Sequence, residues 1–304
     1  MRFYRALSLS FLLVSAFYST FSTGSESHSP KGLEDFAGDY LHGKTNPFFI
    51  SDYLSTNGNI RSFEQESNVA LNKLDYAQME ERIDILKKNR TSSVFSALLS
   101  GQNYCFISIK NETIAYHFSN KEVELNNEFS LVHELEHCLD WSRKLNGEVA
   151  DPAQQIENED VYREMYADVA ASIYIASQQG DLSIFDDVML FRTMAFKYNH
   201  DVKHWSYLAL KEARQRMKKN ELIEKFKGDY RLMATESVAQ SSKKYPLSIY
   251  QCISKQSRLA TNSNQYAAFK RCSPSLGDEI STLFIEMDKN YNAAKLIAFY
   301  KEVK

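Results

Sequence analysis

The segment His133-Glu134-Leu135-Glu136-His137 places two imidazoles four residues apart in a stretch of sequence that is expected to be helical. Positions i and i+4 lie above one another on a helix, so both rings can bind one tetrahedral zinc ion. Glu134 follows the first ring and can reach a water molecule at the metal and take its proton. The chain contains only 7 His in 304 residues, and the pattern would arise by chance with a probability on the order of one per cent. The segment therefore predicts a metal-binding helix rather than a surface helix with two idle histidines.

The apolar and polar residues around this motif fall on different sides of the expected helix, as is typical of a helix with one buried side. Asn126 or Asn127 can cap the N-terminus of the helix. Apolar residues form the expected core side: Leu131, Val132, Leu135 and Leu139. This pattern favours a helix that packs into a core and presents His133, Glu134 and His137 on another side.

A zinc ion held by two imidazoles needs a third protein ligand if one position is to stay open for water. Residues 161–177 are expected to form a helix that carries Glu164 and Asp168 on one face. We predict that Glu164 is the third ligand and that Asp168 accepts the free ring N–H of His133. Small residues would let this helix approach the first one closely: Ala167, Ala170, Ala171 and Ser172. Acidic residues in the loop expected before this helix are alternatives to Glu164: Glu157, Glu159 and Asp160.

His-Glu-x-x-His followed by Glu-x-x-x-Asp on a later helix resembles the zincin metallopeptidases of the glutamate-ligand branch, the gluzincins, which include the thermolysin-like enzymes. The resemblance covers residues 129–172 and does not identify the family within this branch. It implies one Zn²⁺ ion bound by His133, His137 and Glu164. It also implies that Glu134 is the general base and then the general acid, and that Asp168 orients His133.

Zinc peptidases also need a donor that stabilises the oxyanion formed during hydrolysis. In thermolysin-like enzymes a His from the C-terminal helical lobe has this role, and the resemblance makes His204 the candidate by its position. Asp201, three residues earlier, would orient it. The opposing interpretation is a packed or surface His near Trp205 and Tyr207, and Tyr166 is a second candidate donor.

The rest of the chain is expected to be mainly helical. Residues 25–60 are rich in Ser, Gly, Asn and Asp and predict an irregular lead-in. Residues 64–88 have the apolar spacing of a helix. The β-rich segments 104–110 and 113–118, with a turn at 111–112, predict a hairpin. This hairpin resembles the upper sheet of the zincins, whose edge strand pairs with extended peptide substrate.

The fold class predicted from these elements is α+β, mainly α, with a small β-sheet over the zinc helix. The resemblance implies a zincin-like domain in two lobes with the metal in the cleft between them. We expect the N-terminal lobe over residues 61–195 and a C-terminal helical lobe over residues 196–304.

The first residues have the layout of a secretory signal peptide. Positive charges at Arg2 and Arg5 precede an apolar run over residues 6–17, and residues 14–16 offer a small-residue cleavage site. We expect removal of residues 1–16, or up to about residue 24, because the apolar run is shorter than the roughly 20 residues that cross a bilayer. The alternative is an uncleaved N-terminal anchor. The mature protein would be periplasmic or secreted, without a membrane span.

Four cysteines suit an exported protein with up to two disulfides. Three pairings are possible, and the sequence does not choose among them. Cys252–Cys272 is favoured because these residues are close in the chain, and a Cys105–Cys138 bridge would join a strand to the back of the zinc helix. Cys138 follows His137 directly and points away from the metal side, so it is not expected to be a ligand.

The composition, with 43% hydrophobic and 25% charged residues, is that of an ordinary globular protein. A formal net charge of −3 gives no basic field to attract nucleic acid. The sequence therefore predicts an exported zinc metalloendopeptidase that acts on a peptide or protein substrate. The alternatives are an inactive zincin-like protein that keeps zinc for binding, and an exported helical interaction protein without metal. The sequence leaves the substrate and the oligomeric state open.

Overall fold

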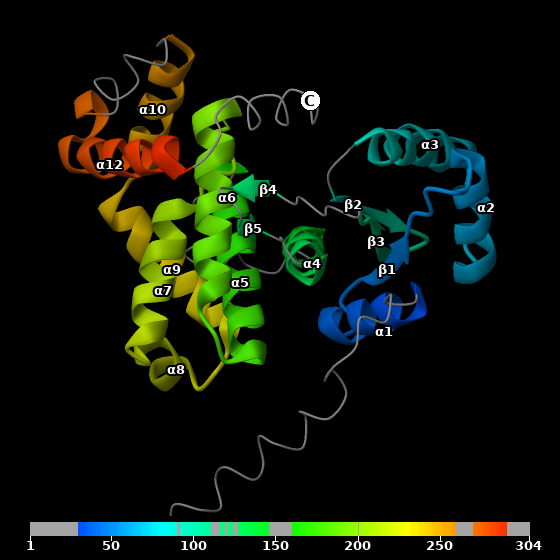
Figure 1. The fold of residues 1–304 in the computed structure, drawn as a ribbon. Helices are drawn as coiled ribbons and strands as arrows, with labels where there is room; N and C mark the ends of the chain where they lie inside the picture. Colours follow the sequence, from blue (N-terminus) through cyan, green and yellow to red (C-terminus); the bar gives the residue numbers. More distant parts are fainter. Residues whose placement is uncertain are drawn as a thin grey trace, which may run out of the picture.

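The computed structural model of the chain describes residues 30–89, 92–110, 116–118, 121–123, 127–145, 160–199, 201–259 and 270–290. Within these residues the protein is mainly helical and has a small three-stranded sheet (Figure 1). The predicted α+β, mainly α class is confirmed, and the predicted signal peptide lies outside the described residues. The helices are α1 (Pro30–Leu41), α2 (Thr56–Ser67), α3 (Lys73–Lys88), α4 (Asn127–Leu145), α5 (Asp160–Gln179), α6 (Ser183–Asn199), α7 (Tyr207–Lys218), α8 (Glu221–Phe226), α9 (Tyr230–Lys244), α10 (Leu247–Leu259) and α12 (Pro274–Asn290). The strands are β1 (Asn46–Phe49), β2 (Ser93–Leu99), β3 (Gln102–Ser108), β4 (Tyr116–Phe118) and β5 (Lys121–Val123).

The three-stranded sheet has the order β1-β3-β2, with β3 in the centre. β1 runs parallel to β3, and β2 runs antiparallel to it. Ser100 and Gly101 connect β2 to β3, and both have positive φ, 50° and 78°. A two-residue turn with two positive φ angles matches the twist of paired strands and makes a tight hairpin.

The predicted hairpin between residues 104–110 and 113–118 is wrong. Residues 102–108 do form a strand, but its partners are β1 and β2, and β4 pairs with β5 instead. The stronger turn signal is the Ser100–Gly101 pair, because glycine takes positive φ without strain. That turn brings β2 beside β3, and within the described residues β2 lies at the edge of the sheet.

The predicted irregular lead-in over residues 25–60 is also wrong where the structure describes it, because it contains α1, β1 and the start of α2. The helix predicted over residues 64–88 is interrupted. α2 ends at Ser67, where Asn68 takes a left-handed conformation with φ 56°, and α3 begins after Asn72. The Asn72 side chain accepts hydrogen bonds from two backbone N–H groups of the first turn of α3 and so caps that helix.

The sheet lies between α4 on one face and α2 and α3 on the other (Figure 1). Successive residues of β3 point to opposite faces. Cys105 and Ile107 belong to the large core that includes α4, whereas Tyr104 and Phe106 belong to a smaller core with Phe63 of α2. Burial on both faces explains why β3 is apolar along most of its length, and it fixes the sheet against the helix that carries the two imidazoles.

α5 is the central helix of the helical part of the protein and contacts α4, α6, α7 and α9. Ala167, Ala170 and Ala171 are buried on this helix. Small side chains let neighbouring helix axes approach closely.

The division into two lobes at residues 195–196 stays a prediction. None of the described helices is both long enough and apolar enough to cross a membrane.

The structure contains two disulfides, Cys105–Cys138 and Cys252–Cys272. It therefore selects one of the three possible pairings, and Cys252–Cys272 is the bridge that the sequence favoured. Disulfides form and persist in oxidising compartments, so both bridges suggest an exported protein.

Candidate metal centre

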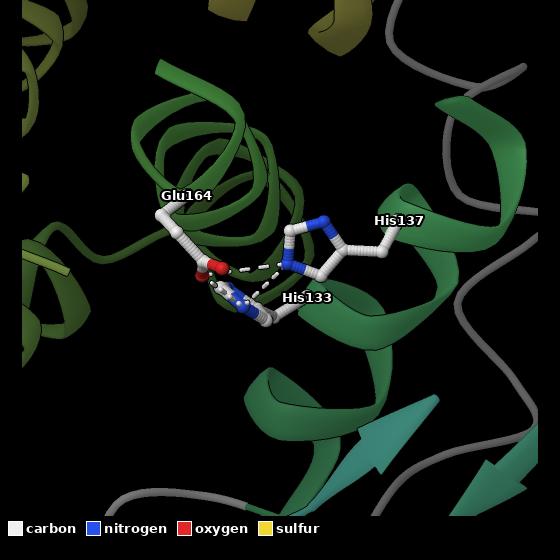
Figure 2. A group of neighbouring side chains, drawn as sticks. All are labelled: His133, His137 and Glu164. Atoms are coloured by element: carbon white, nitrogen blue, oxygen red, sulfur yellow. Dashed lines mark hydrogen bonds and ion pairs between the residues drawn. The ribbon is translucent and has the colours of Figure 1, made fainter. Parts of the chain in front are cut away.

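Three side chains from two neighbouring helices converge on one point (Figure 2). His133 and His137 come from α4, and Glu164 comes from α5. The two Nε2 atoms lie 3.1 Å apart, and Oε2 of Glu164 lies 3.3 Å from Nε2 of His133 and 3.4 Å from Nε2 of His137. The three atoms form a nearly equilateral triangle. We call these three side chains the His-His-Glu group.

The size of this triangle fits a small metal ion. A tetrahedral zinc ion lies about 2.0–2.1 Å from its nitrogen and oxygen ligands, which puts any two ligand atoms about 3.3 Å apart. The observed separations of 3.1, 3.3 and 3.4 Å are close to this value. The His-His-Glu group could therefore hold one metal ion. Two imidazoles and one carboxylate are a donor set that zinc accepts, although the geometry alone does not identify the metal.

Helix periodicity and close helix packing build this arrangement. His133 and His137 are one turn apart on α4, and α5 packs directly against α4. The buried alanines of α5 allow the close approach that the Glu164 arm needs. Glu164 thus faces both imidazoles, while its role as a zinc ligand stays a prediction. Of the alternatives to Glu164, two lie outside the described residues and one begins α5: Glu157, Glu159 and Asp160.

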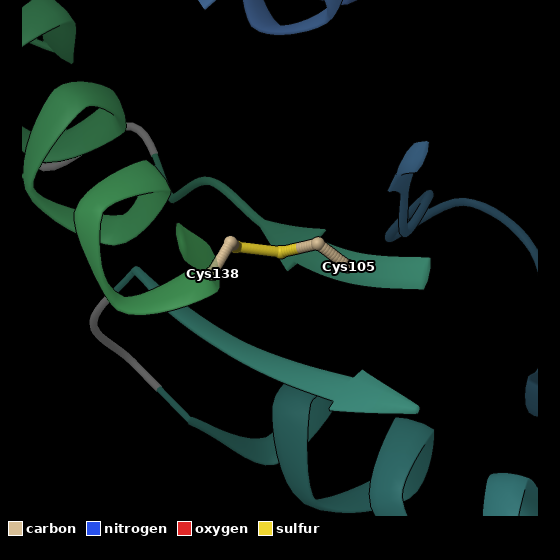
Figure 3. Close-up of a disulfide and its surroundings, with 2 residues drawn as sticks. All are labelled: Cys105 and Cys138. Atoms are coloured by element: carbon tan, nitrogen blue, oxygen red, sulfur yellow. A yellow bond between two sulfur atoms is a disulfide. The ribbon is translucent and has the colours of Figure 1, made fainter. Parts of the chain in front are cut away.

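Another side of α4 is joined to the sheet. Cys138 follows His137 in the chain and forms a disulfide with Cys105 of β3 (Figure 3). Both cysteines are fully buried. The α4 backbone beside the second imidazole is therefore attached covalently to the central strand of the sheet.

Replacing Cys105 and Cys138 with Ala is expected to lower the free energy of unfolding by about 3–4 kcal/mol, because the disulfide bridges a sequence separation of 33 residues. The same change is expected to weaken metal binding, since α4 loses its covalent link to β3. Urea unfolding and zinc titration measure the two effects.

The control is Cys252→Ala/Cys272→Ala, whose separation of 20 residues predicts a similar loss of stability without a change in zinc affinity. Equal zinc affinity in the two double variants would show that the Cys105–Cys138 bridge contributes only to the stability of the fold and not to metal binding.

Asp168 lies one turn beyond Glu164, and its Oδ1 is 2.9 Å from Nδ1 of His133. Arg192 of α6 donates two hydrogen bonds to this carboxylate, at 2.8 and 2.6 Å, and the hydroxyl of Ser206 donates another. Asp168 is completely buried. Burial alone would raise the pKa of Asp168, but Arg192 and His133 hold it well below its ordinary value. The carboxylate is therefore ionised and lies against the His133 ring, while its role in orienting that ring stays a prediction.

Arg192 and Ser206 are contacts that the sequence does not predict. Arg192 is the one charged residue in the mostly apolar segment from Leu190 to Met194 on α6. A charge in such a run signals an anionic partner, because burial of an unpaired charge is costly. The run itself does not say which carboxylate that partner is.

Without a metal ion, His133 carries a proton. Burial lowers the pKa of this imidazole, but the carboxylates of Asp168 and Glu164 outweigh burial and raise it to about 10. Burial would raise the pKa of Glu164, but hydrogen bonds from His133 and His137 bring it well below its ordinary value. A metal ion bound at Nε2 would therefore displace a proton from His133, and the same carboxylates would stabilise the positive charge of that ion.

Asp168→Asn keeps the size of the side chain and removes its charge. We expect zinc affinity to fall about 10–100-fold, because the His133 ring loses the carboxylate that orients it and raises its basicity. Arg192 loses its anionic partner in the same variant, so unfolding is measured together with zinc titration. Asp186→Asn is the matched control, since Asp186 of α6 pairs with Arg214 at 2.6 Å and is half exposed. Zinc affinity equal to that of the control would contradict the orienting role.

The segment around His204 lies beside the same group. Nε2 of His204 is 3.6 Å from Oε2 of Glu164, and its Nδ1 is 2.8 Å from a carboxylate oxygen of Asp201. The structure thus brings His204 and Asp201 together, next to the His-His-Glu group. Lys203, which the sequence does not single out, has its Nζ 3.6 Å from Oε1 of Glu164. Tyr166 is two positions after Glu164 on α5 and therefore lies on a different side of that helix.

Two carboxylates flank the imidazole pair on α4, and their surroundings differ. Glu136 is buried and accepts hydrogen bonds from Tyr40 and Arg231, so it is held in an ion pair. Glu134 is only partly buried, directly after His133. Of these two carboxylates, Glu134 is therefore the more accessible one.

Comparisons with protein-family models, with curated proteins and with solved structures give no significant match. The resemblance of the two motifs to the gluzincins is thus not accompanied by similarity over the whole chain.

Proposed function

We propose that the protein is an exported zinc metallopeptidase of the glutamate-ligand zincin type. The observation that carries this proposal is the triangle formed by His133, His137 and Glu164, whose dimensions suit one tetrahedral zinc ion. Within the described part of the chain this group has three members. Three protein ligands and an open position are typical of catalytic zinc sites, whereas structural sites have four protein ligands.

A bound zinc ion supplies Lewis acidity, which lowers the pKa of water towards 7 and polarises a carbonyl group. Glu134 takes a proton from the attacking water as general base and passes it to the leaving amine as general acid. Asp168 keeps the His133 ring in the orientation that leaves its Nε2 free for the metal. His204, oriented by Asp201, donates a hydrogen bond to the substrate oxygen as it becomes negative.

The position of β2 supports an extended peptide as substrate. In the described part of the sheet β2 is an edge strand, and it contacts α4. An extended peptide can add to a sheet edge through main-chain hydrogen bonds, while pockets for alternate side chains give specificity. In this proposal β2 has the substrate-pairing role that the resemblance assigned to a strand of the predicted hairpin.

Zinc analysis and a peptide-cleavage assay on the native protein test this proposal. We expect one zinc ion per chain and hydrolysis of a peptide library that is lost on chelation and restored by added zinc. Thermal unfolding with and without zinc adds a second measure, because a ligand of the folded state raises the unfolding temperature. A protein without zinc affinity would refute the proposal. Zinc binding without cleavage would favour the alternative, an inactive zincin-like protein that keeps the metal for structure or binding.

A further inference from the structure

Glu136 is a carboxylate inside the zinc-binding segment that the proposed chemistry does not use. It is 2% exposed. Its Oε1 accepts a hydrogen bond from the hydroxyl of Tyr40 on α1 at 2.6 Å and from Nε of Arg231 on α9 at 3.1 Å. Because α1, α4 and α9 are distant in the sequence, this carboxylate joins three separate parts of the chain.

Arg231 is held by several contacts of its own. A second guanidinium nitrogen donates to the backbone carbonyl of Tyr40 at 3.3 Å. The guanidinium also lies over the rings of Tyr40 and Tyr230, 5.1 and 5.0 Å from their centroids. Tyr174 of α5 packs edge-on against both rings, with centroids 5.4 and 5.3 Å away. A planar guanidinium can donate hydrogen bonds from its edge and stack through its faces at the same time, which an ammonium group cannot.

An ion pair inside a protein is not by itself a strong source of stability. Apolar residues of similar volume are often as stabilising or more so, because charges lose their hydration on burial. The Glu136–Arg231 pair instead restricts geometry, because its hydrogen bonds and the planar guanidinium fix the relative orientation of the groups that they join.

A metal site needs such orientation. Ligand distances tolerate deviations of only about 0.2 Å. Rotation of α4 by about 20° would move a side-chain atom about 7 Å from the helix axis by roughly 2 Å. The position of the two imidazoles therefore depends on what fixes α4 about its own axis.

We propose that Glu136 and Arg231, supported by Tyr40, are positioning residues that fix the rotation of α4, so that both imidazoles face Glu164. Glu136 acts on the flank of the imidazole pair opposite Glu134, and the disulfide to β3 holds a third side of the same helix. This role rests on the metal site of the proposed function but does not depend on peptidase activity.

Zinc affinity, measured by competition with a chromophoric chelator, tests this role in a set of variants. Glu136→Gln keeps the shape of the side chain and removes its charge. Arg231→Met keeps an unbranched chain and removes the guanidinium. Glu136→Leu/Arg231→Met replaces the pair with apolar residues and leaves neither charge unpaired. Val238→Ala is the matched control, because Val238 is buried on α9 and its truncation destabilises the fold without touching the pair.

We expect every change in the pair, including the double variant, to weaken zinc binding by at least about 10-fold. The visible spectrum of the Co²⁺-loaded protein, which reports on ligand geometry, should change in the same variants. Val238→Ala should lower the unfolding temperature, while zinc affinity and the Co²⁺ spectrum of the folded protein stay at wild-type values.

The double variant is the decisive test of the positioning role. It is expected to fold even where a single change leaves a buried charge unpaired. A double variant that binds zinc as tightly as the wild type, with an unchanged Co²⁺ spectrum, would refute the positioning role and leave the proposed function intact. A wild-type chain that binds no zinc would overturn the metal site and this role together.

Discussion

Glu134→Gln is expected to abolish peptide hydrolysis while leaving zinc bound. The amide has the shape of the carboxylate but accepts no proton at neutral pH, so the attacking water loses its general base. General bases contribute about 10²- to 10⁴-fold to rate, and we expect kcat/KM to fall by at least about 10³-fold. Glu134 is not a member of the His-His-Glu group, so the zinc content of the variant should stay at the wild-type level.

Steady-state kinetics on one cleaved peptide and zinc analysis of the same preparation measure these two effects together. Glu81→Gln is the matched control, because Glu81 is exposed on α3, on the far face of the sheet from α4. Loss of zinc together with activity in Glu134→Gln would mean that this carboxylate supports metal binding rather than proton transfer. Full activity would rule out the proposed mechanism.

Helix periodicity accounts for the part of the site that the sequence could predict. His133 and His137 share a face because they are four residues apart on one helix, and Glu164 and Asp168 share a face for the same reason. The small residues of α5, such as Ala167, indicate that a neighbouring helix comes close. Helix spacing thus predicts which residues share a face within each helix. The convergence of the two pairs is predicted from the small residues of the second helix together with the resemblance to the gluzincin motifs.

Contacts between distant segments could not be anticipated in this way. Arg192 lies on α6 and Arg231 on α9, and the sequence does not say which carboxylate each one meets. The pairing of β3 with β1 is equally non-local. Residues 30–41 lie in a stretch rich in turn-forming residues, yet they form α1, in which Tyr40 and Leu41 are buried. Tertiary packing overrides weak local propensity at such positions.

Glu164→Ala is expected to remove most of the zinc from the purified protein. Two imidazoles alone leave the ion without an anionic ligand, and solvent must supply the other positions. Loss of an outer partner of a ligand lowers metal affinity about 10–100-fold, so loss of a direct ligand should lower it by more than about 100-fold. Peptide hydrolysis should fall in proportion to zinc occupancy.

Two further substitutions of Glu164 distinguish the effect of the negative charge from the effect of side-chain length. Glu164→Gln keeps the length of the arm and removes the charge, whereas Glu164→Asp keeps the charge and shortens the arm by one methylene. We expect both to weaken zinc binding, because the ion needs an anionic oxygen and because separations of 3.3 and 3.4 Å from the imidazoles need the full arm.

The matched control for Glu164→Ala is Glu279→Ala. Glu279 is a partly buried carboxylate of α12 that pairs with Lys211 of α7, so its loss removes a comparable ion pair away from the metal group. If Glu164→Ala retained the zinc content of this control, the third ligand would be another carboxylate. Glu157 and Glu159, in the segment before α5, would then be the residues to replace, and the triangle of donor atoms would no longer support a catalytic site.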